Sequence, residues 1–175
     1  GRILSVPRAK AVKPPGSSTH ASQGYRYQWG KAMPFIVAHL TALATPFLIP
    51  VTWPAVGWAL SMHFLRMFGI TGGYHRYFSH RTYKTSRVFQ FFLALLGTLS
   101  VQKGVLWWAA NHRNHHRYSD LEGDVHSPIR DGFWWSHVGW IISEKHEDTK
   151  FDGIRDFTKY PELVWLNKFY LVPVV

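Results

Sequence analysis

The sequence contains no cysteine among its 175 residues, which excludes disulfide bonds, thiolate metal sites and cysteine nucleophiles. Acidic residues are also scarce, because 10 Asp and Glu stand against 20 Lys and Arg, for a formal net charge of +10. A basic excess suits anionic lipid, nucleic acid or an acidic protein partner. Since the basic residues flank apolar stretches and no nucleic-acid motif is present, the sequence favours a membrane and no nucleic acid.

The sequence begins with a basic segment and ends in an apolar one. Residues 1–31 carry basic charges and no acid, and the run PPGSS at 14–18 does not favour regular structure. We therefore predict a basic, mobile N-terminal tail over 1–31. The sequence starts at Gly1 and stops at Val175 within an apolar run, so we expect it to be a fragment.

Two apolar stretches predict a transmembrane hairpin with helices over about 34–51 and 54–74. Eighteen helical residues extend about 27 Å, close to the roughly 30 Å hydrocarbon core. Basic residues precede the first helix and follow the second, whereas the turn between them is uncharged. The positive-inside rule then places the tail and the residues that follow position 74 in the cytoplasm. A further span is expected to begin over 163–175.

Residues 88–108 form another apolar stretch, whose uncharged core ends at 101 and is short for a bilayer. Basic residues lie on both sides of it: Arg81, Lys84, Arg87, Arg113 and Arg117. We predict an interfacial or re-entrant helix here, because a full crossing would separate the histidines that flank this stretch.

Those histidines form two clusters, His75 with His80 and His112 with His115 and His116. Neutral imidazole is a good ligand for iron, zinc and copper. On an α-helix the second cluster lies within an arc of about 100°, but the adjacent His115 and His116 diverge, which suits two ions a few ångströms apart. His75 and His80 would lie about 140° apart, which suits two neighbouring ions or a helix that unwinds between them. We predict all five as metal ligands.

Motifs that the sequence lacks restrict the choice of metal site. The sequence has no HExxH motif, no Glu-x-x-His pattern of soluble di-iron bundles, and no carboxylate inside the clusters. Histidine-only ligation with room for two ions suits non-haem iron used with dioxygen, and zinc also fits the ligand type. We interpret His20, His137 and His146, outside the clusters, as polar anchors at a membrane interface.

Longer motifs around the clusters resemble the membrane-bound fatty acid desaturases, in particular their Δ9, stearoyl-CoA desaturase-like branch. Residues 71–84 (TGGYHRYFSHRTYK) resemble the first histidine box of that branch, and 112–120 (HRNHHRYSD) resemble the second. Residues 123–128 (GDVHSP) and 132–140 (GFWWSHVGW) resemble the segment that follows. The resemblance covers about residues 30–175. It implies an all-α integral membrane fold, with 32–175 as part of a desaturase domain.

The resemblance also implies the chemistry. Two non-haem iron ions held by the five box histidines would use O2 to remove one hydrogen from each of two adjacent methylenes. The product would carry a cis double bond, at Δ9 in this branch. The expected partners are a fatty acyl substrate, with acyl-CoA favoured, membrane lipid, and an electron donor such as cytochrome b5 or ferredoxin. The membrane would be the endoplasmic reticulum or the bacterial inner membrane, with the histidine boxes cytoplasmic. The remaining ligands are expected outside this sequence, so the fragment alone is expected to be inactive.

Substrate contacts are implied at four positions. Gln102 and Trp108 match residues that line the bent acyl tunnel of the family. Where acyl-CoA members place Asn, Arg and Asp near the headgroup, this sequence has Lys103, Ala110 and Asn111, so an acyl-lipid carrier stays open. Lys103 is suited to meet a phosphate. Two other functions also stay open: a hydroxylase or ketolase on the same scaffold, and a non-catalytic membrane protein that binds metal.

Overall fold

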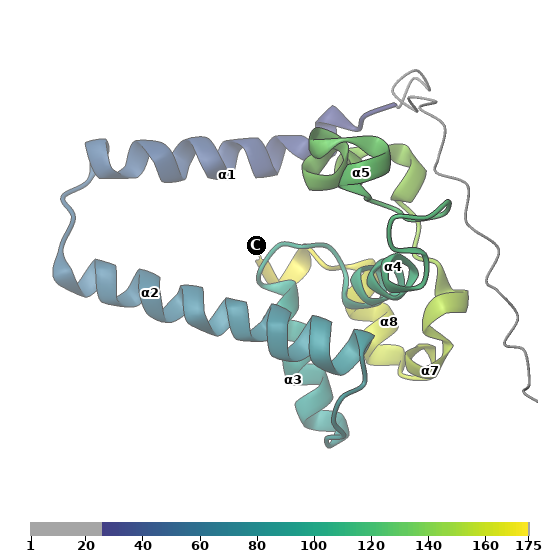
Figure 1. The fold of residues 1–175 in the computed structure, drawn as a ribbon. Coiled ribbons are helices and arrows are strands. Elements are labelled where there is room, and N and C mark those ends of the chain that lie inside the picture. The colour runs from purple at the N-terminus through teal and green to yellow at the C-terminus, as the bar shows by residue number, and fades with distance from the viewer. Residues whose placement is uncertain (1–25, 175) are drawn as a thin grey trace, which may run out of the picture.

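The computed structural model describes residues 26–174, and this part of the chain is helical (Figure 1), which confirms the predicted all-α class there. An isolated antiparallel bridge joins Tyr27 to Ser143. Most of the predicted mobile tail, at 1–25, lies outside the described residues. The elements in chain order are α1 (Trp29–Leu48), α2 (Trp53–Phe68), η2 (Gly69–Ser79), α3 (Arg87–Thr98), α4 (Val105–Tyr118), α5 (Pro128–Asp131), η3 (Trp135–Gly139), α6 (Trp140–Ile142), η4 (Glu144–His146), η5 (Phe151–Ile154), α7 (Arg155–Thr158), α8 (Pro161–Lys168) and η6 (Val172–Val174).

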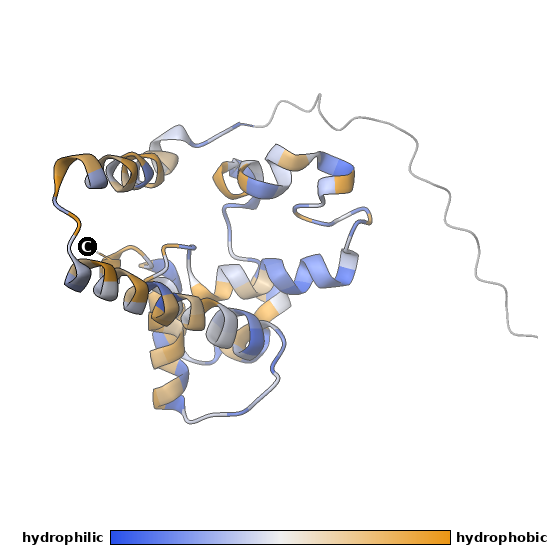
Figure 2. Ribbon diagram, turned by 60° about the vertical axis from the view of Figure 1, so that its left-hand side comes forward, coloured by the Kyte–Doolittle hydropathy of each residue, from blue (hydrophilic) through white to orange (hydrophobic). Residues whose placement is uncertain are grey.

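Helices α1 and α2 form a hairpin that extends to one side of the later helices (Figure 1). Thr52 begins α2 by accepting a hydrogen bond from the backbone N–H of Ala55 at 3.4 Å, and Pro54 suits the first turn. Much of the hairpin is coloured hydrophobic in Figure 2. Many of its apolar side chains are exposed, for example Phe47 at 88% and Trp53 at 87%.

Three helix boundaries of the predicted hairpin need correction. Helix α1 begins at Trp29 and ends at Leu48, so it starts earlier than the predicted 34 and takes in the last residues of the predicted tail. Helix α2 ends at Phe68 instead of 74, because the chain continues there as a π-helix. Within residues 26–174, no helix is both long and apolar enough to cross a membrane.

The π-helix η2 carries the first histidine box and packs tightly on α3. A Cβ added to Gly69 would lie 2.7 Å from the backbone carbon of Leu96, and one added to Gly97 would lie 2.3 Å from the ring of Tyr74. The Tyr74 hydroxyl pairs with the Thr98 hydroxyl at 2.9 Å. The two glycines therefore allow the backbones of η2 and α3 to approach closely.

The predicted helix over 88–108 is wrong as a single element, because the chain bends between α3 and α4. Val101 and Lys103 in the bend have φ values of 58° and 63°, in the left-handed region. Tertiary hydrogen bonds hold both the bend and the first turn of α4. The Lys103 carbonyl accepts a hydrogen bond from the Tyr74 hydroxyl at 3.2 Å, and the Asn167 side chain accepts one from the Trp107 backbone N–H at 2.8 Å.

The predicted span over 163–175 is also not observed as a long helix. Helix α8 has 8 residues and ends at Lys168, and η6 follows it. Leu163 and Leu166 on α8 have no exposed surface. Both belong to the core, which is built by η2, α3, α4, η5, α7 and α8 and consists of Tyr74, Tyr77, Phe78, Leu93, Ala94, Val105, Leu106, Ala109, Ala110, Ile154, Phe157, Leu163 and Leu166.

Arg113 on α4 ties the two histidine-bearing elements to the later part of the chain. Its guanidinium forms a bidentate pair with Asp156 at 2.8 and 3.0 Å. It also donates to the carbonyl oxygens of Ser79 at 3.1 Å, Phe78 at 2.6 Å and Gly153 at 3.1 Å. These contacts use all five N–H groups of the arginine. We call this set of contacts the Arg113 clamp.

The Asp156 carboxylate of the clamp is charged at neutral pH. Burial raises the pKa of Asp156, but the hydrogen bonds and charge of Arg113 outweigh burial, so the net pKa lies below its ordinary value. Both side chains of the pair are only 22% exposed. A pair of this kind, with its hydrogen bonds satisfied, fixes geometry more strongly than an exposed ion pair does.

The contact between Gly97 and Tyr74 predicts a stability loss on overpacking. In the complete protein, Gly97→Ala should lower the free energy of unfolding by about 1–3 kcal/mol, because the buried Tyr74 ring must move. Gly57→Ala is the matched control, since no atom outside its own helix lies within 4 Å of the added Cβ. Denaturant titration checks both, and equal midpoints for the two variants would contradict the close packing.

The clamp predicts that lysine cannot replace arginine at position 113. Arg113→Lys keeps the charge but loses the five-donor fork, and should lower the free energy of unfolding by about 1–3 kcal/mol. Arg155→Lys is the matched control, because Arg155 pairs with Asp152 and their side chains are 79% and 89% exposed. That control should stay within about 0.5 kcal/mol of the parent in thermal and denaturant melts. A neutral Arg113→Lys change would show that the clamp is dispensable.

Candidate metal centre

Four of the five box histidines gather at one place, which we call the four-histidine group: His75, His80, His112 and His116. One ring nitrogen from each lies within 4.8 Å of the others. The first two come from η2 and the residue that ends it, and the last two from α4. The ring centroids of His75 and His112 are 4.7 Å apart, so the predicted convergence of the two boxes is confirmed.

The π-helix explains how His75 and His80 come to share one face. The backbone N–H of His80 donates to the carbonyl of His75, five residues earlier, at 3.0 Å, which is the hydrogen-bond pattern of a π-helix. The wider turn brings the two ring centroids to 4.5 Å. The helix does not unwind between the two histidines but continues as a π-helix up to Ser79.

The separations within the group suit the ligands of one ion. The Nε2 atom of His112 lies 3.2 Å from Nε2 of His80 and 3.0 Å from Nε2 of His116. Two imidazole ligands, each about 2.1 Å from an ion and roughly 90–110° apart, lie about 3.0–3.4 Å from each other. The donor set of four imidazoles therefore fits a metal such as iron or zinc.

Burial keeps part of the group neutral, which is the form that binds metal. Burial, together with the neighbouring rings of His116, His75, His80 and His115, lowers the pKa of His112 to about 3. Burial also lowers the pKa of His80, with further effects from His75 and His116. Both imidazoles therefore carry an available lone pair at neutral pH.

His115 is not part of the four-histidine group. Its ring centroid lies 6.5 Å from that of His112 and 5.7 Å from that of His116. Its Nδ1 atom instead contacts a carboxylate oxygen of Asp124 at 2.8 Å. Its ring also stacks on His126, with centroids 4.3 Å apart. His115 therefore diverges from His116, as helix geometry predicts, and its role as a metal ligand stays a prediction.

The bend after α3 holds two of the predicted substrate residues. Gln102 lines a cavity of about 520 Å³ together with Trp58, Met62 and Arg66 of α2. The ammonium of Lys103 lies over the ring of Trp107, 4.7 Å from its centroid. Neither residue is placed against the four-histidine group by these contacts.

The other two predicted substrate residues lie on α4, beside the histidines. Trp108 stacks on His112, with ring centroids 4.7 Å apart and planes 21° apart. Asn111 is buried, and its side chain donates to the Trp107 carbonyl at 3.0 Å. The side-chain amide oxygen of Asn111, Oδ1, is buried with no hydrogen-bond partner. Trp108 is therefore the predicted substrate residue with a direct contact to the metal-binding candidates.

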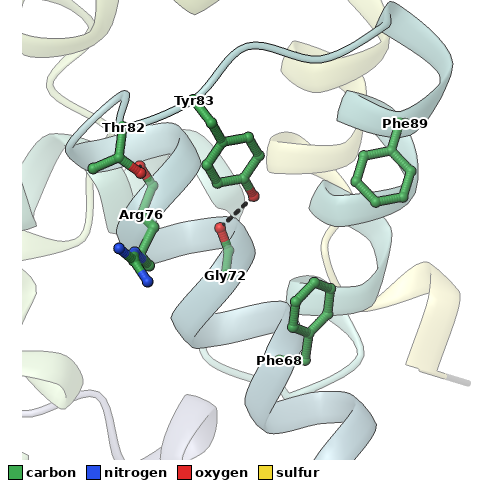
Figure 3. Close-up of a pocket in the computed structure, with 6 residues that line it drawn as sticks. All are labelled: Phe68, Gly72, Arg76, Thr82, Tyr83 and Phe89. Atoms are coloured by element: carbon green, nitrogen blue, oxygen red, sulfur yellow. Dashed lines mark hydrogen bonds between the residues drawn. The ribbon is translucent and has the colours of Figure 1, made fainter.

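A second cavity lies on η2, outside the predicted site residues (Figure 3). It measures about 430 Å³ and is lined by Phe68, Gly72, Arg76, Thr82, Tyr83 and Phe89. The Tyr83 hydroxyl donates to the Gly72 carbonyl at 2.6 Å and forms part of its wall. This cavity contains no member of the four-histidine group.

Sequence reasoning missed residues that support the site from a distance. Arg113 and Asp156 form the clamp, and Asp124 holds His115. The acids lie outside the histidine boxes, so ligand spacing gives no signal for them. His146, predicted as an interfacial anchor, is instead buried at 6% exposure, and burial lowers its pKa to about 4. His20 lies outside the described residues.

Comparison with known proteins agrees with the motifs. The family model described as fatty acid desaturase matches residues 50–171. The chain is 34% identical to the Delta(9)-fatty-acid desaturase fat-5 of Caenorhabditis elegans, over 82% of this chain and 44% of that protein. It is 37% identical to the sn-1 stearoyl-lipid 9-desaturase of Anabaena variabilis, over 82% of this chain and 53% of that protein. It is 40% identical to the acyl-CoA desaturase of Cyprinus carpio, over 81% of this chain and 45% of that protein.

The chain thus spans about half the length of these curated relatives. The family match extends over more than half of the chain and includes both histidine boxes. The chain belongs to the fatty acid desaturase family.

Proposed function

We propose that the complete protein is an oxygen-dependent desaturase that introduces a cis double bond, at Δ9, into a fatty acyl chain. The observation that carries this proposal is the four-histidine group, in which both boxes supply ring nitrogens within 4.8 Å of one another. Relatives with 9-desaturase in their names support the position of the double bond.

The metal in this proposal is a pair of non-haem iron ions. The four-histidine group would bind one ion, and His115 would contribute to a second. The bound iron would supply dioxygen activation and electron transfer. In the overall reaction, O2 takes two hydrogens from adjacent methylenes, two electrons from an external donor and two protons, and leaves as two waters. Trp108, stacked on His112, would shield the site from bulk water and hold the ring plane.

The proposed substrate is acyl-CoA, with Gln102 and Trp108 along the acyl chain. Lys103 would meet a phosphate of the headgroup, and the side-chain oxygen of Asn111 on α4 is buried without a hydrogen-bond partner. One relative is named for acyl-CoA and another for a stearoyl-lipid, so the carrier is tested by offering purified protein both forms of the same acyl chain.

A membrane location accounts for the exposed apolar hairpin. Side chains such as Leu43, Phe47 and Trp53 are at least 70% exposed, which suits contact with lipid. The basic excess would place the histidine boxes on the cytoplasmic side, at the endoplasmic reticulum or the bacterial inner membrane. The same charge would attract an acidic electron donor such as cytochrome b5 or ferredoxin.

Iron binding by the four-histidine group predicts the effect of a single substitution. In the complete protein, His116→Ala should lower the iron content per polypeptide and abolish activity, because it removes one of four converging ligands. His137→Ala is the matched control, since His137 is exposed and lies outside the group. Metal analysis and product assay check both. Normal iron and turnover in the His116→Ala protein would refute its role as a ligand.

The product distinguishes desaturation from hydroxylation on the same scaffold. Mass spectrometry of the acyl product should show the loss of two hydrogens, with the new double bond at Δ9. A gain of one oxygen would identify a hydroxylase. Iron binding with no oxygen consumption in the presence of an electron donor and an acyl substrate would instead indicate a non-catalytic metal-binding protein.

A further inference from the structure

Outside the four-histidine group, His115 pairs with a buried carboxylate, that of Asp124. The Asp124 side chain has no exposed surface, and its Oδ1 atom lies 2.8 Å from Nδ1 of His115. The same oxygen accepts the backbone N–H of His126 at 3.2 Å. The other oxygen accepts the backbone N–H of Asp120 at 2.9 Å.

Each oxygen of Asp124 already accepts a backbone N–H, from His126 at Oδ1 and from Asp120 at Oδ2, which is the hydrogen-bonding role of a carboxylate. Since the carboxylate can only accept, His115 must carry its proton on Nδ1. The lone pair of His115 is then on Nε2.

The position of His115 suits a ligand that is adjacent to the four-histidine group but separate from it. Its ring centroid lies 5.7 Å from that of His116, which follows it on α4. Stacking on His126, whose ring in turn stacks on Trp140 with centroids 4.8 Å apart, restricts rotation of the ring. A buried carboxylate that orients an imidazole through Nδ1 is a common support for a metal ligand.

We propose that Asp124 is a positioning residue, which fixes the tautomer and orientation of His115 so that Nε2 serves a second metal ion beside the four-histidine group. This inference rests on the proposed function, because it requires that the complete protein binds two iron ions. It goes beyond that function in assigning a role to a carboxylate outside the histidine boxes.

The test measures iron in the complete purified protein. Iron per polypeptide and iron affinity are compared for the parent, Asp124→Asn, His115→Ala and the double variant. Mössbauer spectra of ⁵⁷Fe-loaded protein follow the two ions separately. Asp152→Asn is the matched control, because the Asp152 side chain is 89% exposed. The melting temperature of each protein is recorded as well.

The expected result is a selective loss at one ion. Asp124→Asn should weaken binding of the second iron by about 10–100-fold while the first iron and its spectrum remain. His115→Ala should lose the second iron, and the double variant should match it, because Asp124 acts through His115. The Asp152→Asn protein should resemble the parent in iron content, iron affinity and spectrum.

Three outcomes would overturn the inference. Parent-like binding of two irons by Asp124→Asn would show that the carboxylate does not position a ligand. Loss of both irons together with a collapsed melting temperature would show a general structural role. A parent protein that binds two irons and a His115→Ala protein that keeps both would remove His115 as a ligand. A parent protein without iron would instead refute the proposed function itself.

Discussion

The Arg113 clamp is the interaction on which the arrangement of the site depends. One guanidinium on α4 holds the carbonyls of Phe78 and Ser79, directly before His80, and pairs with Asp156 far along the chain. The first box is thereby fixed against the helix that carries the second. Because arginine presents its donors in a rigid plane, the clamp sets an orientation as well as a distance.

The chemistry of the site follows from burial and from the π-helix. Imidazoles packed this closely would repel one another if they were protonated, and burial adds to that cost. At His112 and His80 both effects lower the pKa, so the rings stay neutral and their lone pairs converge. Ligands of one ion must also lie on the same face of their helix, and the π-helix places His75 and His80 on one face.

Much of the site could be predicted from the sequence, because ligand chemistry is encoded in local spacing. The HxxxxH and HxxHH patterns indicated the histidines that the fold brings together, and the apolar stretches indicated helices. The split of 88–108 could not be predicted from hydropathy. It depends on left-handed backbone at Val101 and Lys103, and on tertiary hydrogen bonds from Tyr74 and Asn167. The divergence of His115 from His116 follows from helix geometry, but the contact of His115 with Asp124 does not follow from the spacing of the histidines.

X-ray absorption at the iron K edge of the purified complete protein tests the central claim most directly, because it identifies the atoms bound to the metal. The convergence of imidazoles from both boxes predicts a first shell dominated by nitrogen at about 2.1 Å, with the outer-shell scattering of imidazole rings. A protein that binds no iron, or iron surrounded mainly by carboxylate and water oxygen, would contradict this account.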